Sequence, residues 1–235
     1  MYQAPAAIAS PLPVRRDRGK CAESVTDRPT PRLLRADPPA DPPAKAELRA
    51  AALRRRAQRA AEDVAARSGA LARHLLADPR WQAARAVAGY VGVRGEPDTR
   101  PLLAAALAAG KRLWLPRMAG PRRDAIEFVA LADLAALAPA PFGLLEPTGG
   151  PGVDLAAANV DLALVPGLAF TRAGARLGFG KAFYDRALAP LRDAPRPLRV
   201  AVCFADDLVE ALPEEPHDVR VHVVATEHGL ADRSG

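Results

Sequence analysis

Residues 161–186, DLALVPGLAFTRAGARLGFGKAFYDR, decide the fold prediction. The first six residues, DLALVP, have the short apolar pattern of a buried strand. A glycine-rich loop follows, and we expect a helix from about Lys181 to Leu191 after it. A strand, a loop and a helix in this succession indicate an α/β fold, in which ligands bind beyond the carboxyl ends of the strands.

The rest of the chain continues the alternation of helix and strand patterns. Lys45–Leu76 is free of proline and rich in Ala, Leu and Arg, so we expect helix up to Asp78–Pro79. Another helix is expected over Pro101–Ala109, with Asp98–Thr99 as its cap and Gly110 as its left-handed end. Apolar strands are expected over residues 86–91, 112–116, 126–131, 161–166, 198–204 and 221–226. We therefore predict a single Rossmann-like domain of the α/β class, with a mostly parallel central sheet flanked by helices on both faces.

The first helical segment also predicts which side faces the core. Its apolar stripe would contain Leu48, Ala52, Leu71 and Leu75. The basic residues Arg54, Arg55, Arg56 and Arg59 would then lie mostly on the solvent side.

The composition is that of a folded protein without a membrane span. Of the 235 residues, 49% are hydrophobic and 26% are charged. No run approaches the ~18–20 apolar residues that crossing a bilayer requires. Only Cys21 and Cys203 are present, which argues against a disulfide-stabilised secreted protein, and the first ten residues lack a signal-peptide pattern. We therefore expect a cytoplasmic protein with no membrane partner.

The charge balance favours a small anionic substrate over nucleic acid. With 33 Lys and Arg against 27 Asp and Glu, the formal net charge is +6. The basic residues are spread along the chain and aromatic residues make up only 5%, whereas nucleic-acid binders concentrate basic charge and interleave it with aromatics. We expect a small-molecule substrate, no nucleic-acid partner and a monomer.

The chain changes character near Lys45. Residues 1–44 contain nine prolines and no apolar periodicity, which predicts a disordered Pro/Arg-rich extension. A start codon assigned too far upstream is an alternative explanation. The folded domain is expected over residues 45–230, and residues 231–235 would form a tail.

The glycine-rich loop has the composition of an anion-binding loop. Glycines at 167, 174, 178 and 180 let backbone amides approach a phosphate closely, while Arg172, Arg176 and Lys181 add positive charge. The loop matches neither a Walker A motif nor the G-x-G-x-x-G pattern. On these residues alone, a tight strand-to-helix connection is equally compatible with the sequence.

Residues 165–186 closely resemble the signature of the 5-formyltetrahydrofolate cyclo-ligase family, written loosely as PG-x-A-F-D…R-L-G-Y-G-[GK]-G-Y-Y-D-R. Motifs similar to the family's occur in the same order elsewhere in the chain. They are K-x-x-x-R at Lys45–Arg49, Tyr90 with Glu96–Thr99, and residues 111–116, 142–147 and 216–218. The resemblance spans about residues 45–227.

The resemblance implies an enzyme that uses ATP and Mg²⁺ to convert 5-formyltetrahydrofolate to 5,10-methenyltetrahydrofolate, releasing ADP and phosphate. Because a formamide oxygen is a poor leaving group, the γ-phosphoryl group of ATP would first be transferred to it. N10 would then attack the activated carbon, and phosphate would depart. Such a transfer depends on positioning and on charge stabilisation.

The resemblance also assigns roles to residues. Lys45 and Arg49, four residues apart on one helix face, would contact ATP phosphates, although spacing alone favours two solvated charges. Lys181 and Arg176 would be catalytic. The nucleotide site would comprise Lys45, Arg49, Arg176, Leu177, Gly178, Phe179, Gly180, Lys181, Ala182, Phe183 and Tyr184. The folate site would comprise Val91, Glu96, Gly178, Phe179, Gly180, Lys181 and Ala182.

Asp185 and Asp218 match the family's Mg²⁺ carboxylates. Magnesium keeps several waters and needs only one or two protein carboxylates beside phosphate oxygens, so this pair is sufficient. Without the resemblance, Asp185 would be a helix N-terminal charge and Asp218 a turn residue.

Several positions depart from the family pattern. Ala182 stands where the family has glycine, and its methyl group costs roughly 1–2 kcal/mol if the backbone there has positive φ. Thr171 replaces an aspartate, Phe179 and Phe183 replace tyrosines, and His222 stands where an aspartate is common. These departures leave open a paralogue that binds nucleotide or folate without turnover. A nucleic-acid-associated module that uses the arginine-rich helix is a further alternative.

Three remaining side chains are expected to be structural. Cys203, within an apolar strand, is predicted to be a small buried residue. Trp81 and Trp114 are predicted to lie in the core or in a pocket wall, where one of them could face the pterin.

Overall fold

The computed structural model describes residues 43–233, so most of the predicted N-terminal extension lies outside the described residues. The helices are α1 (Pro43–Ala57), α2 (Ala61–Ala77), α3 (Pro79–Ala83), α4 (Arg100–Ala108), α5 (Leu155–Ala158) and α6 (Phe183–Leu188). Short 3₁₀ turns cover Leu134–Ala136, Pro141–Gly143, Ala189–Leu191 and Ala205–Asp207. The strands up to residue 153 are β1 (Ala86–Ala88), β2 (Arg112–Ala119), β3 (Ala125–Leu131), β4 (Leu137–Pro139), β5 (Leu145–Pro147) and β6 (Gly152–Val153). The later strands are β7 (Leu162–Val165), β8 (Ala169–Phe170), β9 (Arg176–Leu177), β10 (Leu198–Val202), β11 (Val223–Thr226) and β12 (Gly229–Asp232).

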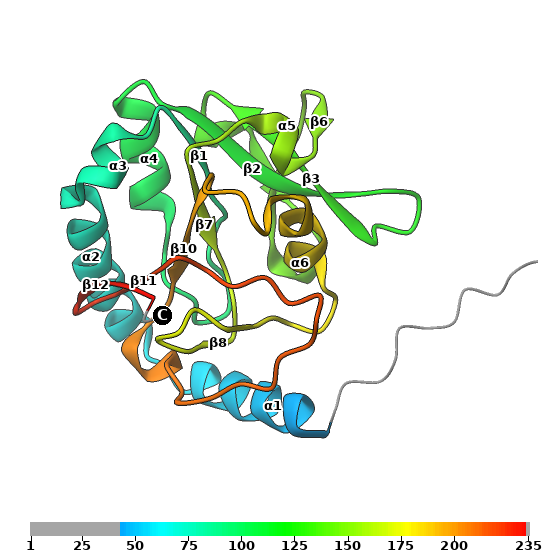
Figure 1. Ribbon diagram of the computed structural model, residues 1–235. Coiled ribbons are helices and arrows are strands. Elements are labelled where there is room, and N and C mark those ends of the chain that lie inside the picture. Colours follow the sequence, from blue (N-terminus) through cyan, green and yellow to red (C-terminus); the bar gives the residue numbers. More distant parts are fainter. Residues whose placement is uncertain (1–42, 234–235) are drawn as a thin grey trace, which may run out of the picture. The chain divides into compact units, whose positions relative to one another are not determined.

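The central sheet has the strand order β12-β11-β10-β7-β1-β2-β3-β6 (Figure 1). The five strands from β11 to β2 are parallel, whereas β12, β3 and β6 pair antiparallel at the two margins. Central strands such as Leu162–Val165 are buried at every position, because helices cover both faces of a parallel sheet. The predicted Rossmann-like α/β domain is confirmed.

Alternate residues of the strands enter two separate cores. Val87, Leu164 and Val202 pack with α2, α3 and α4 on one face. Ala88, Val165 and Ala201 pack with α5 and α6 on the other face. The side chains of a strand point alternately to opposite faces, so a short apolar run supplies both cores. Figure 1 shows the two groups of helices on opposite sides of the sheet.

The chain reverses its winding direction between β1 and β7, which are neighbours in the sheet. From β1 the chain passes through α4 to β2 on one side, whereas β7 continues to β10 on the other. At such a point the connections leave the carboxyl ends of the two strands in opposite directions and open a crevice. The segments that follow β1 and β7 therefore border the expected ligand site.

The expectation for the first helical segment is wrong in two respects. The segment is two helices, α1 and α2, which are interrupted at residues 58–60. Its arginines do not all face solvent, because the side chains of Arg56 and Arg59 are 2% and 4% exposed. They are buried against carboxylates from distant parts of the chain, a pairing that hydrophobic periodicity does not reveal.

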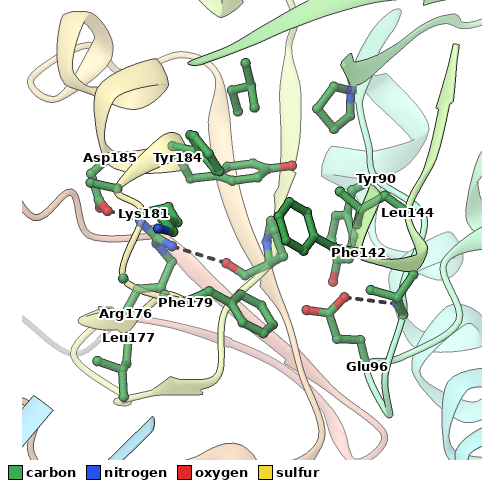
Figure 2. Close-up of a pocket in the computed structure, with 18 of the residues that line it drawn as sticks. Tyr90, Glu96, Phe142, Leu144, Arg176, Leu177, Phe179, Lys181, Tyr184 and Asp185 are labelled. Carbon is green, nitrogen blue, oxygen red and sulfur yellow. Dashed lines mark hydrogen bonds and ion pairs between the residues drawn. The ribbon is translucent and has the colours of Figure 1, made fainter. Parts of the chain in front are cut away.

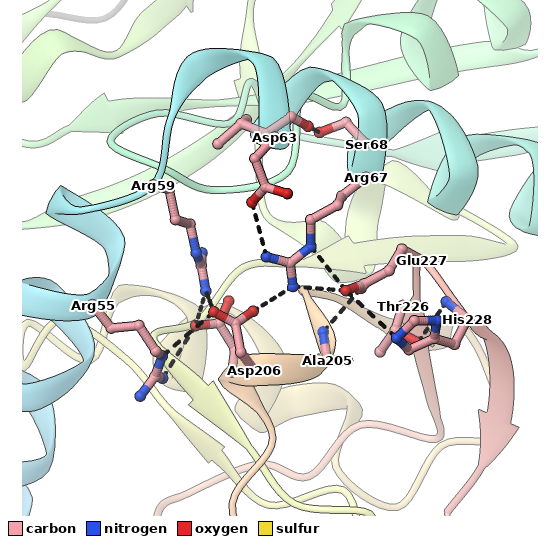
Figure 3. Close-up of polar contacts among 12 residues, drawn as sticks. Arg55, Arg59, Asp63, Arg67, Ser68, Ala205, Asp206, Thr226, Glu227 and His228 are labelled. Atoms are coloured by element: carbon pink, nitrogen blue, oxygen red, sulfur yellow. Dashed lines mark hydrogen bonds and ion pairs between the residues drawn. The ribbon is translucent and has the colours of Figure 1, made fainter.

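An ion-pair network holds α1 and α2 to the carboxyl ends of β10 and β11 (Figure 3). Arg59 and Arg67 both pair with Asp206, at 2.9 and 2.5 Å, and Arg67 also pairs with Glu227 at 2.6 Å. Both guanidinium groups lie over the Phe204 ring, 4.9 and 4.3 Å from its centroid. Arginine in a stacked and paired position stabilises the contact more than a solvated charge would.

The predicted caps and strands differ from the structure in detail. The Thr99 hydroxyl donates to the Tyr90 carbonyl instead of capping α4, and Asp98 accepts from the Arg100 amide at 3.0 Å. Gly110 has φ +69°, as expected. The helix expected over 181–191 is α6 followed by a 3₁₀ turn. Strand β12, which includes the first residues of the expected tail, and the short β4–β5 and β8–β9 pairs lack an alternating pattern in the sequence.

Within residues 43–233, no helix combines the length and the hydrophobicity that crossing a membrane requires.

Candidate functional site

A cavity of about 380 Å³ opens at the carboxyl ends of β1 and β7. Every site residue predicted from the sequence lines it: Lys45, Arg49, Val91, Glu96, Arg176, Leu177, Gly178, Phe179, Gly180, Lys181, Ala182, Phe183, Tyr184, Asp185 and Asp218. These residues come from α1, from the segment after β1, from the loop before α6 and the first turn of α6, and from the loop before β11. The fold thus brings together segments that are up to 173 residues apart in sequence.

The cavity has two chemically different ends (Figure 2). We call Lys45, Arg49, Arg176, Lys181, Asp185, Glu215, His217 and Asp218 the cationic end. We call Tyr90, Val91, Glu96, Phe142 and Leu144 the glutamate end. Figure 2 shows Arg176, Lys181 and Asp185 on one side, Glu96 and Tyr90 on the other, and the Tyr184 and Phe179 rings between them.

Lys45 is fixed at the cationic end by two carboxylates. Its ammonium group donates to Asp218 Oδ2 at 2.8 Å and to Glu215 Oε2 at 3.0 Å, and the Lys45 side chain is 5% exposed. Burial lowers the pKa of Lys45, but the hydrogen bonds to Asp218 and Glu215 outweigh it, so the net pKa is raised. Lys45 therefore stays charged at neutral pH, and it is not the solvated charge that helix spacing alone favours.

Arg49 ties α1 to the glycine-rich loop. Its Nε donates to the Gly178 carbonyl at 2.8 Å. Burial lowers the pKa of Arg49, while the negative charges of Asp218, Glu215 and Asp185 oppose that effect. Arg49 consequently lies in the field of both carboxylates that the sequence assigned to a metal.

The glycine-rich loop brings one exposed and one buried cation to the cavity. Lys181 is exposed, whereas the Arg176 side chain is 4% exposed and pairs with Asp185. Gly167, where the loop begins, has no room for a side chain, since a Cβ there would lie 2.6 Å from the Phe170 ring and 3.0 Å from Arg176. The loop therefore holds Arg176 in a tightly packed position and leaves Lys181 accessible to a ligand.

Ala182 adopts the left-handed conformation, with φ +51° and ψ +24°, directly before α6. An L-residue with a Cβ is strained there by about 1–2 kcal/mol, whereas glycine is not. The backbone at Ala182 therefore has the positive φ at which the sequence analysis expects the methyl group to be unfavourable. Lys181 and Asp185, on either side of Ala182, nevertheless both line the cavity.

The potential metal ligands at the cationic end suit a hard divalent cation. Glu215, His217 and Asp218 each offer one ligand atom, and these atoms lie within 4.8 Å of one another. Asp185 lines the same cavity but is engaged by Arg176 rather than joined to that group. Carboxylate oxygens beside an anion-binding loop are the ligands that Mg²⁺ prefers. Sequence reasoning missed Glu215 and His217, which the run of acidic residues before Asp218 could have indicated.

Glu96 is the polar centre of the glutamate end. Its side chain is 5% exposed, its Oε2 accepts from the Val93 amide at 3.1 Å, and its Oε1 lies 3.3 Å from Arg56 Nη1. Burial raises the pKa of Glu96, and the charge of Arg56 opposes the rise. Glu96 can accept hydrogen bonds from N–H groups of a bound ring.

Apolar and aromatic side chains line the rest of the cavity. Phe142 and Phe179 are 64% and 45% exposed, an unusual exposure for large apolar side chains. Between the two ends, the Tyr184 hydroxyl is buried and has no hydrogen-bond partner among the described residues. Burial raises the pKa of Tyr184, so its hydroxyl keeps a proton to donate. A planar ligand with polar edges matches these groups.

Other positions singled out by the sequence have structural roles. Thr171 Oγ1 accepts from the Ala175 amide at 3.1 Å and closes the turn in which it lies. His222 Nδ1 accepts from the Arg199 amide at 3.1 Å, and His222 does not line the cavity.

Cys203 is fully buried, as expected, and burial raises the pKa of its thiol. Trp81 lies in the core, and neither it nor Trp114 lines the cavity, so neither faces a ligand there.

Comparison with known proteins identifies the family. The model of the 5-formyltetrahydrofolate cyclo-ligase family matches residues 41–227. A 5-formyltetrahydrofolate cyclo-ligase of Mycolicibacterium smegmatis is 38% identical over 155 residues, which are 62% of this chain and 76% of that protein. The enzyme of that name from Mus musculus is 25% identical over 80% of this chain and 96% of its own.

A solved structure leads to the same family. The NMR structure of Aquifex aeolicus 5,10-methenyltetrahydrofolate synthetase superimposes with a TM-score of 0.70 and 33% sequence identity. The match covers 81% of this chain and 94% of that one. The chain belongs to the 5-formyltetrahydrofolate cyclo-ligase family.

Proposed function

We propose that this enzyme converts 5-formyltetrahydrofolate to 5,10-methenyltetrahydrofolate in the cavity described above, and that it consumes ATP with Mg²⁺ and releases ADP and phosphate. The conversion is the activity named for the relatives of this chain. One observation carries the site assignment. The cationic end and Glu96 border a single cavity at the point where the sheet reverses its winding direction.

The cationic end suits a triphosphate. Lys45, Arg49 and Lys181 are within one cavity wall, and the backbone amides around Gly178 and Gly180 lie beside them. Lysine acts as a point charge and arginine as a two-pronged donor toward phosphate oxygens. We assign Lys181 to the transferring phosphoryl group because it is the exposed cation of the glycine-rich loop that lines the cavity. Lys45 and Arg49 would hold the remaining phosphates.

Asp185 and Asp218 would hold the magnesium ion, with Glu215 and His217 close to Asp218. Bound Mg²⁺ would neutralise charge on the phosphate oxygens. In the present structure Asp185 is paired with Arg176, and Asp218 is paired with Lys45. Release of these two pairs would leave Arg176 and Lys45 able to bind phosphate oxygens. The two aspartates would then hold the magnesium ion, and the basic side chains released from them would bind the nucleotide.

The glutamate end suits the reduced folate. Glu96 would accept hydrogen bonds from N–H groups of the pterin, and Phe142 and Phe179 offer ring faces to flat parts of the ligand. A folate bound between the two ends would have its formyl oxygen directed toward Lys181. The γ-phosphoryl group would be transferred to that oxygen. N10 would then attack the formyl carbon, and phosphate would leave with the former formyl oxygen.

An absorbance assay tests the proposal directly. Purified full-length protein with ATP, Mg²⁺ and 5-formyltetrahydrofolate should give the near-ultraviolet absorbance rise of the methenyl product, together with one ADP per turnover. Omission of either ATP or Mg²⁺ should abolish the rise. A folded preparation that produces neither the absorbance rise nor ADP would contradict the proposal. Light scattering and cell fractionation would test the accompanying expectation of a cytoplasmic monomer.

A further inference from the structure

Arg56 lies behind the glutamate end rather than in it. Its side chain is 2% exposed, and Arg56 is not among the described residues that line the cavity. Its guanidinium group lies between two carboxylates, with Nη1 3.3 Å from Glu96 Oε1 and Nη2 3.4 Å from Asp207 Oδ2. Nη2 also donates to the Gly167 carbonyl. Arg56 thus connects α1, the segment after β1, the loop after β7 and the turn after β10.

The turn that carries Glu96 contacts the C-terminal end of α1 and the link after it. The Glu96 amide donates to the Val93 carbonyl at 3.0 Å, and the Gly95 carbonyl accepts from Arg59 Nη1 at 2.7 Å. Gly95 has φ +75° and lies so close to Arg56 that a Cβ would be 2.8 Å from the Arg56 carbonyl oxygen. The backbone and the carboxylate of Glu96 are therefore both positioned from α1 and the link that follows it.

Few groups near Glu96 could stabilise its negative charge. The charged or titratable groups facing it are Arg56 from α1, Asp207 from the turn after β10, Tyr90 after β1 and Tyr184 from α6. Burial raises the pKa of Glu96, Arg56 and the Val93 amide lower it, and Asp207 raises it further. Arg56 is the only cation among these neighbours. Without it, a buried carboxyl group would take up a proton.

We propose that Arg56 is a positioning residue for folate binding, which holds the Glu96 carboxylate ionised and aimed into the cavity while Asp207 and the Gly167 carbonyl fix Arg56 itself. The proposal rests on the assignment of Glu96 as a folate contact. A carboxylate can accept hydrogen bonds from pterin N–H groups through both oxygens. In a carboxylic acid, one oxygen carries a proton and acts as a donor, so it no longer matches an N–H group. Arg56 acts only through Glu96 and has no role toward ATP.

Substitution Arg56→Gln tests the proposal through two steady-state parameters. We expect the KM for 5-formyltetrahydrofolate at pH 7 to rise about tenfold or more, the loss that accompanies a broken charged hydrogen bond. The KM for ATP should change less than about twofold. The folate KM of the variant should also acquire a pH dependence and fall as the pH is raised from 6 to 9, because Glu96 then loses its proton. Arg56→Lys retains the charge and should keep a nearly flat pH profile.

Arg55→Gln is the matched control, since Arg55 contacts Asp206 and Asp207 from the same helix but not Glu96. Its folate KM and pH profile should equal those of the wild type. In a Glu96→Gln background, Arg56→Gln should cause no further rise in the folate KM. If Arg56→Gln does not fold, Arg56→Lys should still raise the folate KM but not the ATP KM.

The proposal is overturned if Arg56→Gln keeps the wild-type folate KM and pH profile. It is equally overturned if Arg56→Gln weakens ATP and folate to the same degree with a lowered Tm, which would indicate a purely structural role. Failure of the underlying function is distinguishable, because the wild-type protein would then produce no methenyl product. In that case, calorimetric titration of wild type and variant with 5-formyltetrahydrofolate measures the same difference in binding.

Discussion

The two ends of the cavity are held in place in different ways. At the glutamate end, the cavity is backed by buried ion pairs, since Glu96, Arg56 and Asp207 are all at most 5% exposed. At the cationic end, Lys181 is exposed on a glycine-rich loop whose last turn passes through the strained Ala182. The carboxylates there are engaged by cations that a ligand could displace. Under the proposed function, the preorganised glutamate end would bind the folate and the adjustable cationic end would carry out the phosphoryl transfer.

The largest expected effect on activity comes from removal of the Lys181 ammonium group. Lys181→Ala should lower kcat about 10²–10³-fold, because a charge that stabilises the transferring phosphoryl group is lost. The folate KM should change less than kcat, since Glu96 is untouched although Lys181 also borders the expected folate site. The matched control is Arg172→Ala, an exposed cation of the same loop that does not line the cavity. A Lys181→Ala enzyme with the kcat of the control would show that Lys181 does not stabilise the transferring phosphoryl group.

Asp218→Asn should have the next largest effect. Asp218 accepts from Lys45 at 2.8 Å and from the Glu215 amide at 2.8 Å, and burial of its charge is offset by these bonds, so its net pKa is lowered. Loss of the carboxylate should raise the Mg²⁺ concentration for half-maximal activity about tenfold or more. Asp193→Asn, an exposed acidic residue near the same surface, serves as the control. An unchanged Mg²⁺ requirement in Asp218→Asn would remove Asp218 from the metal site.

Ala182→Gly tests the strain in the adjustable end. Relief of the left-handed alanine should stabilise the protein by about 1 kcal/mol, partly offset by the greater freedom of glycine in the unfolded chain. The expected Tm increase is about 2–4 °C. Ala104→Gly, at an exposed position inside the right-handed helix α4, should have the opposite sign. If both substitutions destabilise the protein equally, the conformation of Ala182 is not the source of strain.

His222→Asn should have the smallest effect, and only on the pH dependence of stability. Burial and the positive charges of Arg199 and Arg233 lower the pKa of His222 to about 4 in the folded chain. Between pH 6.5 and 4 the unfolded chain therefore binds a proton that the folded chain does not, so stability falls as the pH falls. Since His222 is partly exposed, we expect a loss of about 1 kcal/mol between pH 7.5 and 5.

Denaturant titrations at the two pH values measure this change. His222→Asn keeps an acceptor for the Arg199 amide, and should reduce the pH-dependent loss of stability. His74→Asn, at an exposed position on α2, should leave the loss unchanged. An identical loss in His222→Asn and in the wild type would assign the proton uptake to other groups.

The two ends also differ in how much the sequence reveals. The residues of the cationic end could be named only through the resemblance to the family's motifs, since the spacing of Lys45 and Arg49 alone favours two solvated charges and Asp218 is 173 residues from Lys45. The parallel sheet could be predicted because each central strand is a continuous apolar run.

The support behind Glu96 could not be predicted in this way. Arg56 is 40 residues from Glu96 and 151 from Asp207, and an arginine in an amphipathic segment is normally assigned to the solvent side. Its burial follows from tertiary partners that no local pattern encodes. The ion pair between Lys45 and Glu215 likewise joins residues that are 170 positions apart in the sequence.

The most direct test of the central claim follows the formyl oxygen. Under the proposed function, ATP would bind at the cationic end, with the formyl group of the folate within reach of its γ-phosphoryl group in the same cavity. With 5-formyltetrahydrofolate that carries ¹⁸O in the formyl group, we predict that each turnover transfers the label to inorganic phosphate, which mass spectrometry detects. Methenyl product formed with the label in water rather than in phosphate would contradict the account.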